Sequence, residues 1–261
     1  MGRNLTDVLL DEKRNGIKGG VYNKFQVDFA YNSNHIEGSR LTHDQTRYIY
    51  ETQTVGIEPA RVNDIIETVN HFRCFDHVLE TLDAPLASDY FKELHRRLKM
   101  ATISADSAEA VVGDFKKYPN FVGDMRTAAP EKVAEELSAL TSRYGSSGGK
   151  GLYEILDFHA EFERIHPFYD GNGRIGRLLM FKECLKNGIV PFFIEDTYKG
   201  YYYRGLKEWQ NGGEKGYLID TCLAMQDKMR GILDYFRIDY DRTEFSMQEI
   251  LKGARTGGKK R

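Results

Sequence analysis

The chain has 261 residues, enough for one large domain or for a small domain with an extension. Apolar residues make up 41% of it and aromatic residues 12%, which excludes a wholly disordered chain. The formal net charge of -2 gives no argument for non-specific binding to nucleic acid or to an anionic membrane. No apolar run approaches the ~20 residues that cross a bilayer, and the charged N-terminus lacks a signal-peptide core. Three cysteines without metal-ligand spacing indicate reduced thiols, so we expect a soluble, cytoplasmic protein.

Apolar residues recur at helical spacing along most of the chain, so the sequence predicts a strongly helical fold. Ser88 is the expected cap of one helix, Pro130 the expected start of another, and Gly188 the expected stop of a third. The helices are expected at 61–82, from 88, from 130, and at 152–165, 174–187 and 217–236.

Residues 113–126 break this pattern with alternating apolar and polar residues and Gly and Pro punctuation. Pro119-Asn120 is the expected turn between two short strands. Because a lone hairpin is marginal in water, it must pack on the helices or on a partner. A loop is expected at 145–151 and a disordered tail at 253–261.

The segment 166–177, HPFYDGNGRIGR, carries the residues expected to do chemistry. Gly171, Asn172 and Gly173 lead into a helix, whose N-terminal N–H groups and partial positive charge suit phosphate. Arg174 and Arg177 share a helix face, so both can bind phosphate oxygens.

Two further side chains complete this phosphate site. Asp170 can hold Mg²⁺ against two phosphates, and His166 can take a proton from an attacking hydroxyl. Each residue alone is more often a cap, a turn or a core residue, but those explanations do not account for all of them converging within twelve residues.

At every specified position the segment resembles the signature of the Fic family, His-x-Phe-x-Asp/Glu-Gly-Asn-Gly-Arg-x-x-Arg. The resemblance covers roughly residues 88–230. It implies an all-α Fic fold, a helical bundle with a β-hairpin flap at 113–126 over the active site. It also implies transfer of AMP from ATP to a Ser, Thr or Tyr hydroxyl of a target protein, with release of pyrophosphate.

The resemblance assigns a role to each signature residue. His166 would be the base, Asp170 the ligand of Mg²⁺ (or Mn²⁺), and residues 171–173 the anion hole. Arg174 would contact the β-phosphate region and Arg177 the γ-phosphate, and Phe168 would be a buried anchor. Gly173, which a kinase relative replaces with lysine, favours AMP transfer over phosphorylation.

Tyr202, Tyr203 and Leu206 match the family segment that packs adenine, and Asn211 is the candidate for its hydrogen bond, with Gln210 as the alternative. Without the resemblance, such an aromatic cluster is more often core. The hairpin would align an extended target segment by β-augmentation, although an ordinary surface hairpin fits the residues equally well.

Residues 33–38 match the inhibitory motif of the same family, Ser/Thr-x-x-x-Glu-Gly/Asn. Ser33 and Glu37 share one face of a helical turn, Gly38 would stop it, and Thr42 opens the next helix with a capping box. A glutamate at a helix C-terminus favours a nearby cation, and Arg177 would supply it. A solvated helix end is the alternative.

Together these observations predict an autoinhibited adenylyltransferase that modifies a target protein docked on the flap, and itself, with ATP as co-substrate. The expected regions are an N-terminal helical region at 1–87, a catalytic core at 88–236 and a tail at 237–261. Transfer of UMP, phosphocholine or phosphate, removal of AMP, and a non-catalytic binding module are the alternatives. A homo-oligomer is left open, and no membrane or nucleic-acid partner is expected.

Overall fold

Helices make up most of the regular structure in the computed structural model, which describes residues 4–56, 58–102, 111–123, 125–146 and 150–253. The elements are α1 (Leu5–Asn15), α2 (Val21–Ile36), α3 (His43–Thr52), α4 (Val62–Glu80), α5 (Ser88–Lys99), β1 (Phe121–Val122), β2 (Met125–Arg126), a 3-10 turn (Pro130–Lys132), α6 (Val133–Ser146), α7 (Leu152–Ile165), α8 (Asn172–Lys186), a second 3-10 turn (Asp196–Tyr198), α9 (Lys199–Gln210), α10 (Gly216–Tyr235) and α11 (Met247–Leu251).

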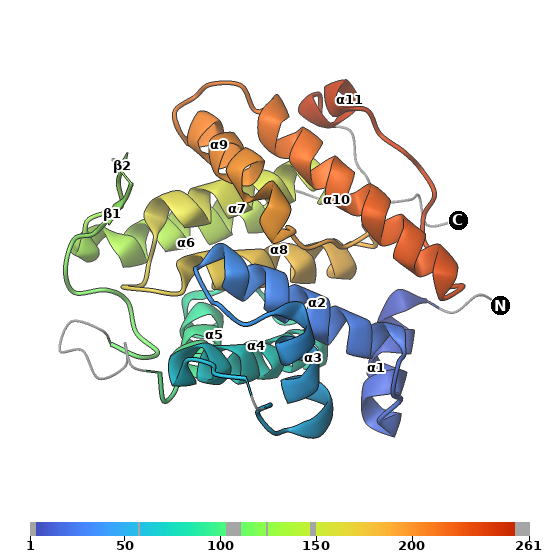
Figure 1. Cartoon of the computed structure of the whole chain (residues 1–261). Helices are drawn as coiled ribbons and strands as arrows, with labels where there is room; N and C mark the ends of the chain where they lie inside the picture. Colours follow the sequence, from blue (N-terminus) through green and yellow to red (C-terminus); the bar gives the residue numbers. More distant parts are fainter. Residues whose placement is uncertain (1–3, 57, 103–110, 124, 147–149, 254–261) are drawn as a thin grey trace.

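Helices α7 and α8 lie in the middle of the molecule, with α9 and α10 on one side and α4 and α5 on the other (Figure 1). Helix α2 crosses close to α8 and packs on both α4 and α8. The antiparallel hairpin β1–β2 projects at one end of the bundle. The expected all-α class with one small hairpin is confirmed.

Phe29 of α2 ties the N-terminal helices to the centre of the bundle. Its ring lies 6.1 Å from Phe75 of α4, 5.4 Å from Phe181 of α8 and 5.5 Å from Phe193, between ring centroids. Phe29 is almost completely buried, and such aromatic contacts add to the free energy gained by burial. The C-terminal end of α2 is thereby held against the N-terminal half of α8.

Most predicted helix bounds agree with the structure to within two residues. Helix α7 spans the predicted range, and Gly188, with φ of 70°, follows α8 as expected. Helix α8 begins at Asn172, two residues before the predicted start, because Gly171 takes the N-cap position with φ of 86°. The predicted cap Ser88 is wrong: Ser88 is the first residue of α5, and Ala87 precedes it without a side-chain cap.

The hairpin turn also differs from the prediction. Val122 pairs with Met125, so the turn includes Gly123, and Asp124 lies outside the described residues. Gly123 supplies the positive φ, 56°, that such a turn favours. Asn120 instead closes the base of the hairpin, because its side-chain oxygen accepts hydrogen bonds from Lys116 and Thr127. The prediction of a turn at Pro119-Asn120 was therefore wrong.

Other expectations fall partly outside the described part of the chain. The first two residues of the predicted loop at 145–151 belong to α6, and residues 147–149 are not described. The predicted tail lies beyond Gly253, outside the described residues. Cys74, Cys184 and Cys222 are free and buried, as expected of thiols in the core.

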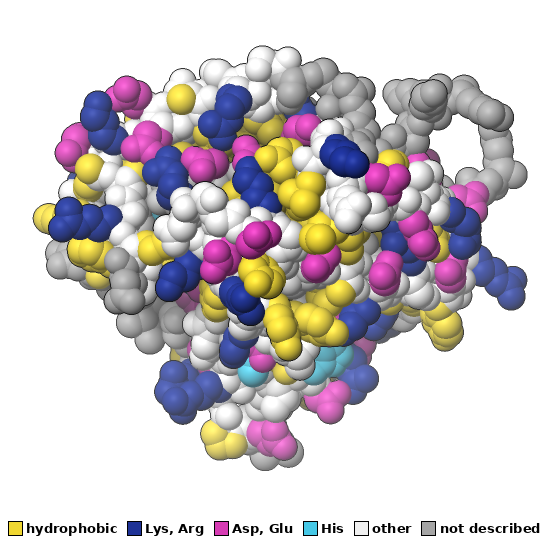
Figure 2. All heavy atoms as spheres, turned by 90° about the horizontal axis from the view of Figure 1, so that it is seen from above, with side chains coloured by type: hydrophobic (Ala, Val, Ile, Leu, Met, Phe, Trp, Pro, Cys, Tyr) yellow, Lys and Arg dark blue, Asp and Glu magenta, His cyan; other side chains and the backbone are white. Residues whose placement is uncertain are grey.

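On the face shown in Figure 2, the described residues carry side chains of both charges, in agreement with the small net charge of the chain. Figure 2 shows basic and acidic side chains interspersed over the face around α9 and α10, with apolar side chains gathered near its middle. Among the described residues, no helix is both long enough and apolar enough to cross a bilayer.

Helices α9 and α10 approach so closely at Gly205 that a methyl group has no room. A Cβ atom there would lie 2.7 Å from the backbone N and Cα of Leu218. We expect Gly205→Ala to lower the free energy of unfolding by about 1–3 kcal/mol, the usual cost of overpacking. Urea unfolding would measure this loss.

Gly231, in exposed helical surface of α10, is the matched control because a Cβ there meets nothing within 4 Å. Gly231→Ala should raise the free energy of unfolding by about 0.5–1 kcal/mol, since alanine favours the helix. Equal effects of the two substitutions would contradict this account of the α9–α10 contact.

Candidate active site

The loop between α7 and α8 is fixed by its own side chains. Asn172 clamps it: its Oδ1 accepts from the Phe168 N–H at 2.8 Å, and its Nδ2 donates to the Phe168 carbonyl at 2.9 Å. The Phe168 ring is fully buried and stacks on His95, with 4.0 Å between centroids. His166, with φ of 51°, ends α7 and turns the chain into this loop. The signature residues are thus held in place before any ligand arrives.

The N-terminus of α8 forms a cradle for an anion. Gly171 adopts a positive φ, and a Cβ there would press on Leu98 at 3.2 Å, so the loop needs glycine on both counts. At Gly173 a Cβ would lie 2.3 Å from Oε1 of Glu37. The carboxylate of Glu37 therefore lies against the first turn of α8, where the helix attracts negative charge.

Arg177 donates hydrogen bonds to Ser33 of α2 and to Glu37, the residue that follows α2. Its Nη2 donates to Glu37 Oε1 at 2.7 Å and to the Ser33 carbonyl at 2.9 Å, and its Nε donates to Ser33 Oγ at 3.0 Å. The side chain of Arg177 is 1% exposed. The contact predicted between Glu37 and Arg177 is present, and Ser33 is a direct partner of the guanidinium. Gly38, with φ of 94°, follows Glu37 and ends the helix as expected.

Arg174 belongs to a ring of alternating charges beside the cradle. It pairs with Glu67 of α4 at 2.6 Å and with Asp170 at 3.4 Å. Lys99, at the end of α5, joins the same two carboxylates at 2.7 Å and 2.6 Å. Arg174 and Lys99 are both almost completely buried, so each cation needs these carboxylates.

Asp170 stays ionised in this ring. Burial alone would raise its pKa, but the positive charges of Arg174 and Lys99 and the Gly171 N–H lower the pKa to about 2. Its side chain is still 41% exposed. The carboxylate is thus a charged oxygen donor at the mouth of the cradle.

The residues present fit a hard divalent cation that takes most of its ligands from elsewhere. Among the described residues, no cluster of three or more ligand-type side chains occurs that could hold a metal alone. Asp170 supplies one oxygen, and Mg²⁺ commonly binds through one or two carboxylates, substrate phosphates and water.

The hydrogen bond of His166 fixes the tautomer of its imidazole ring. Its Nδ1 lies 3.3 Å from the Glu163 carbonyl, which can only accept, so Nδ1 carries the proton and Nε2 holds the lone pair. Burial, with help from the charge of Lys116, lowers the pKa of His166 to about 4. The imidazole is therefore neutral at physiological pH.

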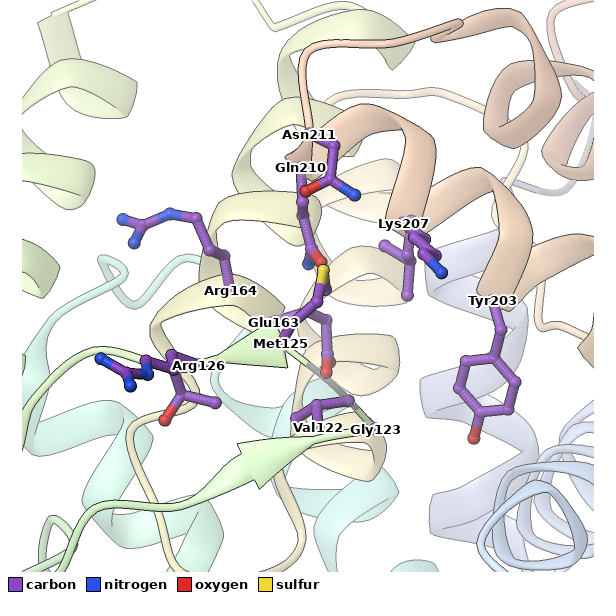
Figure 3. Close-up of a pocket in the computed structure, with 12 residues that line it drawn as sticks. Val122, Gly123, Met125, Arg126, Glu163, Arg164, Tyr203, Lys207, Gln210 and Asn211 are labelled. Carbon is purple, nitrogen blue, oxygen red and sulfur yellow. The ribbon is translucent and has the colours of Figure 1, made fainter.

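The predicted adenine wall is divided by the structure. Tyr203, Leu206, Gln210 and Asn211 line a cavity of about 680 Å³ that also includes residues of the hairpin (Figure 3). Tyr202 is not among its lining residues; it is buried, and its hydroxyl lies 2.7 Å from Nε2 of His159. The amide nitrogen of Gln210 already donates to the Ala160 carbonyl at 2.9 Å.

Several site residues escaped the sequence analysis. Lys99 and Glu67 lie more than seventy residues before Arg174 and carry no motif of their own, so only the fold reveals them. Lys116 is 3% exposed, and its Nζ donates to Asn120, Thr127 and the Ile165 carbonyl, which ties the hairpin to the end of α7. A lysine inside an otherwise alternating strand pattern was the one available signal.

Residues 85–184 match the family model described as "Fic/DOC family". Two relatives named protein adenylyltransferase Fic, from Nematostella vectensis and Drosophila willistoni, are 28% identical over 188 residues and 32% identical over 187. The alignments cover 70% and 68% of this chain but 43% and 35% of the relatives. The chain thus spans less than half the length of these curated relatives.

Solved structures agree on the fold. A Fic domain containing signaling protein from Bacteroides thetaiotaomicron has a TM-score of 0.69 at 22% identity, covering 88% of this chain and 95% of that chain. Fic-1 from C. elegans, residues 134–508 with E274G, has a TM-score of 0.68 at 19% identity, covering 87% of this chain and 67% of that chain. Residues 85–184 of this chain are therefore a domain of the Fic/DOC family.

Proposed function

We propose that this protein is an autoinhibited adenylyltransferase that transfers AMP from ATP to a hydroxyl group of a target protein and of itself. The observation that carries the proposal is the neutral imidazole of His166 beside the glycine cradle of α8. The names of the relatives support the same activity. We place the catalytic core at residues 88–236, with the inhibitory segment 33–38 in the region before it.

The proposed reaction exchanges a phosphoanhydride bond of ATP for a phosphodiester bond to the target. The oxygen of a Ser, Thr or Tyr hydroxyl attacks the α-phosphorus of ATP, and its proton goes to Nε2 of His166. The bond from the α-phosphorus to the bridging oxygen breaks, and pyrophosphate leaves. The N–H groups at Gly171–Gly173 stabilise the negative charge that develops on the α-phosphate oxygens. Arg174 contacts the β-phosphate, and Arg177 contacts the γ-phosphate once Glu37 has moved.

A divalent cation would be held by Asp170 together with phosphate oxygens. When bound, Mg²⁺ or Mn²⁺ would neutralise part of the negative charge of the phosphates. Lys99 and Arg174 fix the orientation of the Asp170 carboxylate from two sides.

We infer that the hairpin receives the target. Phe121 and Val122 of β1 are 62% and 39% exposed, which is unusual for apolar strand residues that pack on a core. A target segment that pairs with this strand would form main-chain hydrogen bonds beside the site. Tyr203, Leu206 and Asn211, which line the cavity under the hairpin, would contact adenine, with Tyr202 supporting them from behind.

Replacing His166 should remove transfer without removing the nucleotide. We expect His166→Ala to lower the rate of AMP incorporation by ~10²–10⁴-fold, since only the base is lost. Radiolabelled AMP incorporation and ATP affinity are measured side by side. His43→Ala, which removes an exposed histidine of α3, is the control and should change neither. A folded His166→Ala protein that transfers AMP at the original rate would falsify the role of base.

The pH dependence should reflect the lowered pKa of this histidine. The base acts in its neutral form, which is lost only as the pH falls through about 4 instead of the ordinary 6.5. We therefore expect kcat/KM to show no protonation step near pH 6.5 on its acid side. A rate profile from pH 5 to pH 8 checks this. A tenfold fall in kcat/KM per pH unit below 6.5 would contradict it.

Releasing Arg177 should raise activity. Glu37→Gly removes the carboxylate that lies against Gly173 and holds the guanidinium, so the γ-phosphate can bind and align the α-phosphate. Because misplacement by ~1 Å can cost ~10²-fold, we expect a gain of that order in AMP incorporation. Ser33→Ala should give a smaller gain.

The double variant tests whether both residues act through one contact. Arg177→Ala on the Glu37→Gly background should lose the gain. Glu51 is an exposed residue of α3, so Glu51→Gly is the control and should leave the rate unchanged. No gain for Glu37→Gly at any ATP or metal concentration would show that residues 33–38 are an ordinary helix end.

A further inference from the structure

Glu163 is a buried acid that no part of the proposed mechanism uses. It lies on α7, three residues before His166. Its Oε1 atom is buried and has no hydrogen-bond partner among the described residues. A buried polar atom without a hydrogen-bond partner lowers the stability of the fold, so a folded protein that retains one usually uses it for a function or for binding a ligand or water.

The neighbouring helix leaves room for this carboxyl group. A Cβ atom at Gly176 of α8 would lie 2.2 Å from Oε1 of Glu163. The glycine therefore allows the acid to lie directly against the helix that carries Arg174 and Arg177. Any larger residue at 176 would push Glu163 away from this place.

The side chain of Glu163 lines the cavity described above. Figure 3 shows it between the hairpin and α9, below Gln210 and Asn211. Gln210 and Asn211 mark the proposed adenine end, whereas His166 and the cradle mark the phosphate end. Glu163 lines the same cavity as Gln210 and Asn211 and lies about one helical turn before His166, so we expect the sugar of a bound nucleotide to pass beside it.

The charges around Glu163 make it both a donor and an acceptor. Burial, opposed by the charge of Arg177 and aided by that of Glu37, raises the pKa of Glu163 to about 8. Of the other titratable groups nearby, His159 is neutral because burial lowers its pKa, and Tyr203 is neutral because burial raises its pKa. A protonated carboxyl group matches a hydroxyl group, which also donates and accepts.

We propose that Glu163 hydrogen-bonds a ribose hydroxyl of the bound nucleotide and so selects ribonucleotides over deoxyribonucleotides. This inference rests on the proposed nucleotide-binding function. Among the described residues, Nη1 of Arg177 and Nδ1 of His159 are, like Oε1 of Glu163, buried without a hydrogen-bond partner, so this cluster leaves polar atoms for a ligand to satisfy.

The test compares the affinities of the full chain for ATP, 2′-deoxy-ATP and 3′-deoxy-ATP, measured by calorimetry. The original protein should bind one deoxy analogue about fivefold to tenfold more weakly than ATP, the value of one buried hydrogen bond. Glu163→Met, of similar length, should weaken ATP binding by the same factor and leave that analogue unaffected. Glu163→Gln, which can still donate and accept, should retain part of the discrimination.

Glu135→Gln makes the same substitution on the exposed face of α6 and should bind all three nucleotides as the original protein does. Equal binding of the three nucleotides by the original protein would overturn the inference, and this outcome needs no variant to fold. Discrimination that survives in Glu163→Met would also overturn it. If the original protein discriminates but the Glu37→Gly variant transfers no AMP, the proposed function fails and this inference stands; if Glu37→Gly transfers AMP while the original protein does not discriminate, the reverse holds.

Discussion

The arrangement of the site depends on the need of one buried cation for an acceptor. Arg177 lies on the inner face of α8 with 1% of its side chain exposed, so water cannot satisfy its guanidinium. Glu37 and Ser33 accept hydrogen bonds from its Nε and Nη2, and both come from the end of α2. The packing of Phe29 on α8 brings that end into reach. In the proposed mechanism a triphosphate would meet the same need with more charge, so the guanidinium would serve two mutually exclusive partners.

A second group of buried charges makes the phosphate end rigid. Glu67, Lys99, Asp170 and Arg174 come from α4, α5, the signature loop and α8, and they alternate in sign. Removing any member would leave each of its two neighbours with one oppositely charged partner instead of two, which is costly for the almost completely buried Lys99 and Arg174. The orientation of the Asp170 carboxylate is thus determined by helices far away in sequence. Positioning of this kind lets a metal ion or phosphate bind without reorganisation of the protein.

The local pattern of the sequence was enough to predict the helices and the signature loop, since apolar spacing and glycine punctuation are properties of neighbouring residues. The range of α7 and the capping box at Thr42 agree with the structure for that reason. The hairpin turn was misplaced in the prediction. Asparagine is a strong turn former, but the side chain of Asn120 accepts hydrogen bonds from Lys116 and Thr127 at the base of the hairpin and forms no turn. Lys99, Glu67 and Glu163 could not be found, because their roles come from contacts between helices and from the space left by Gly176. Tyr202 and Tyr203 are adjacent in sequence, yet only the fold shows that one faces the cavity and the other the core.

The separation of Glu37 and Arg177 along the chain has a consequence for biosynthesis. The two residues lie 140 positions apart, with the glutamate nearer the N-terminus. At synthesis rates of about 5–20 residues per second, Glu37 is made roughly 7–28 s before Arg177. Helix formation takes about a microsecond, so α2 has ample time to form before its partner exists. When α8 then folds, its guanidinium meets a glutamate already in place, and each newly made molecule starts with the arginine occupied.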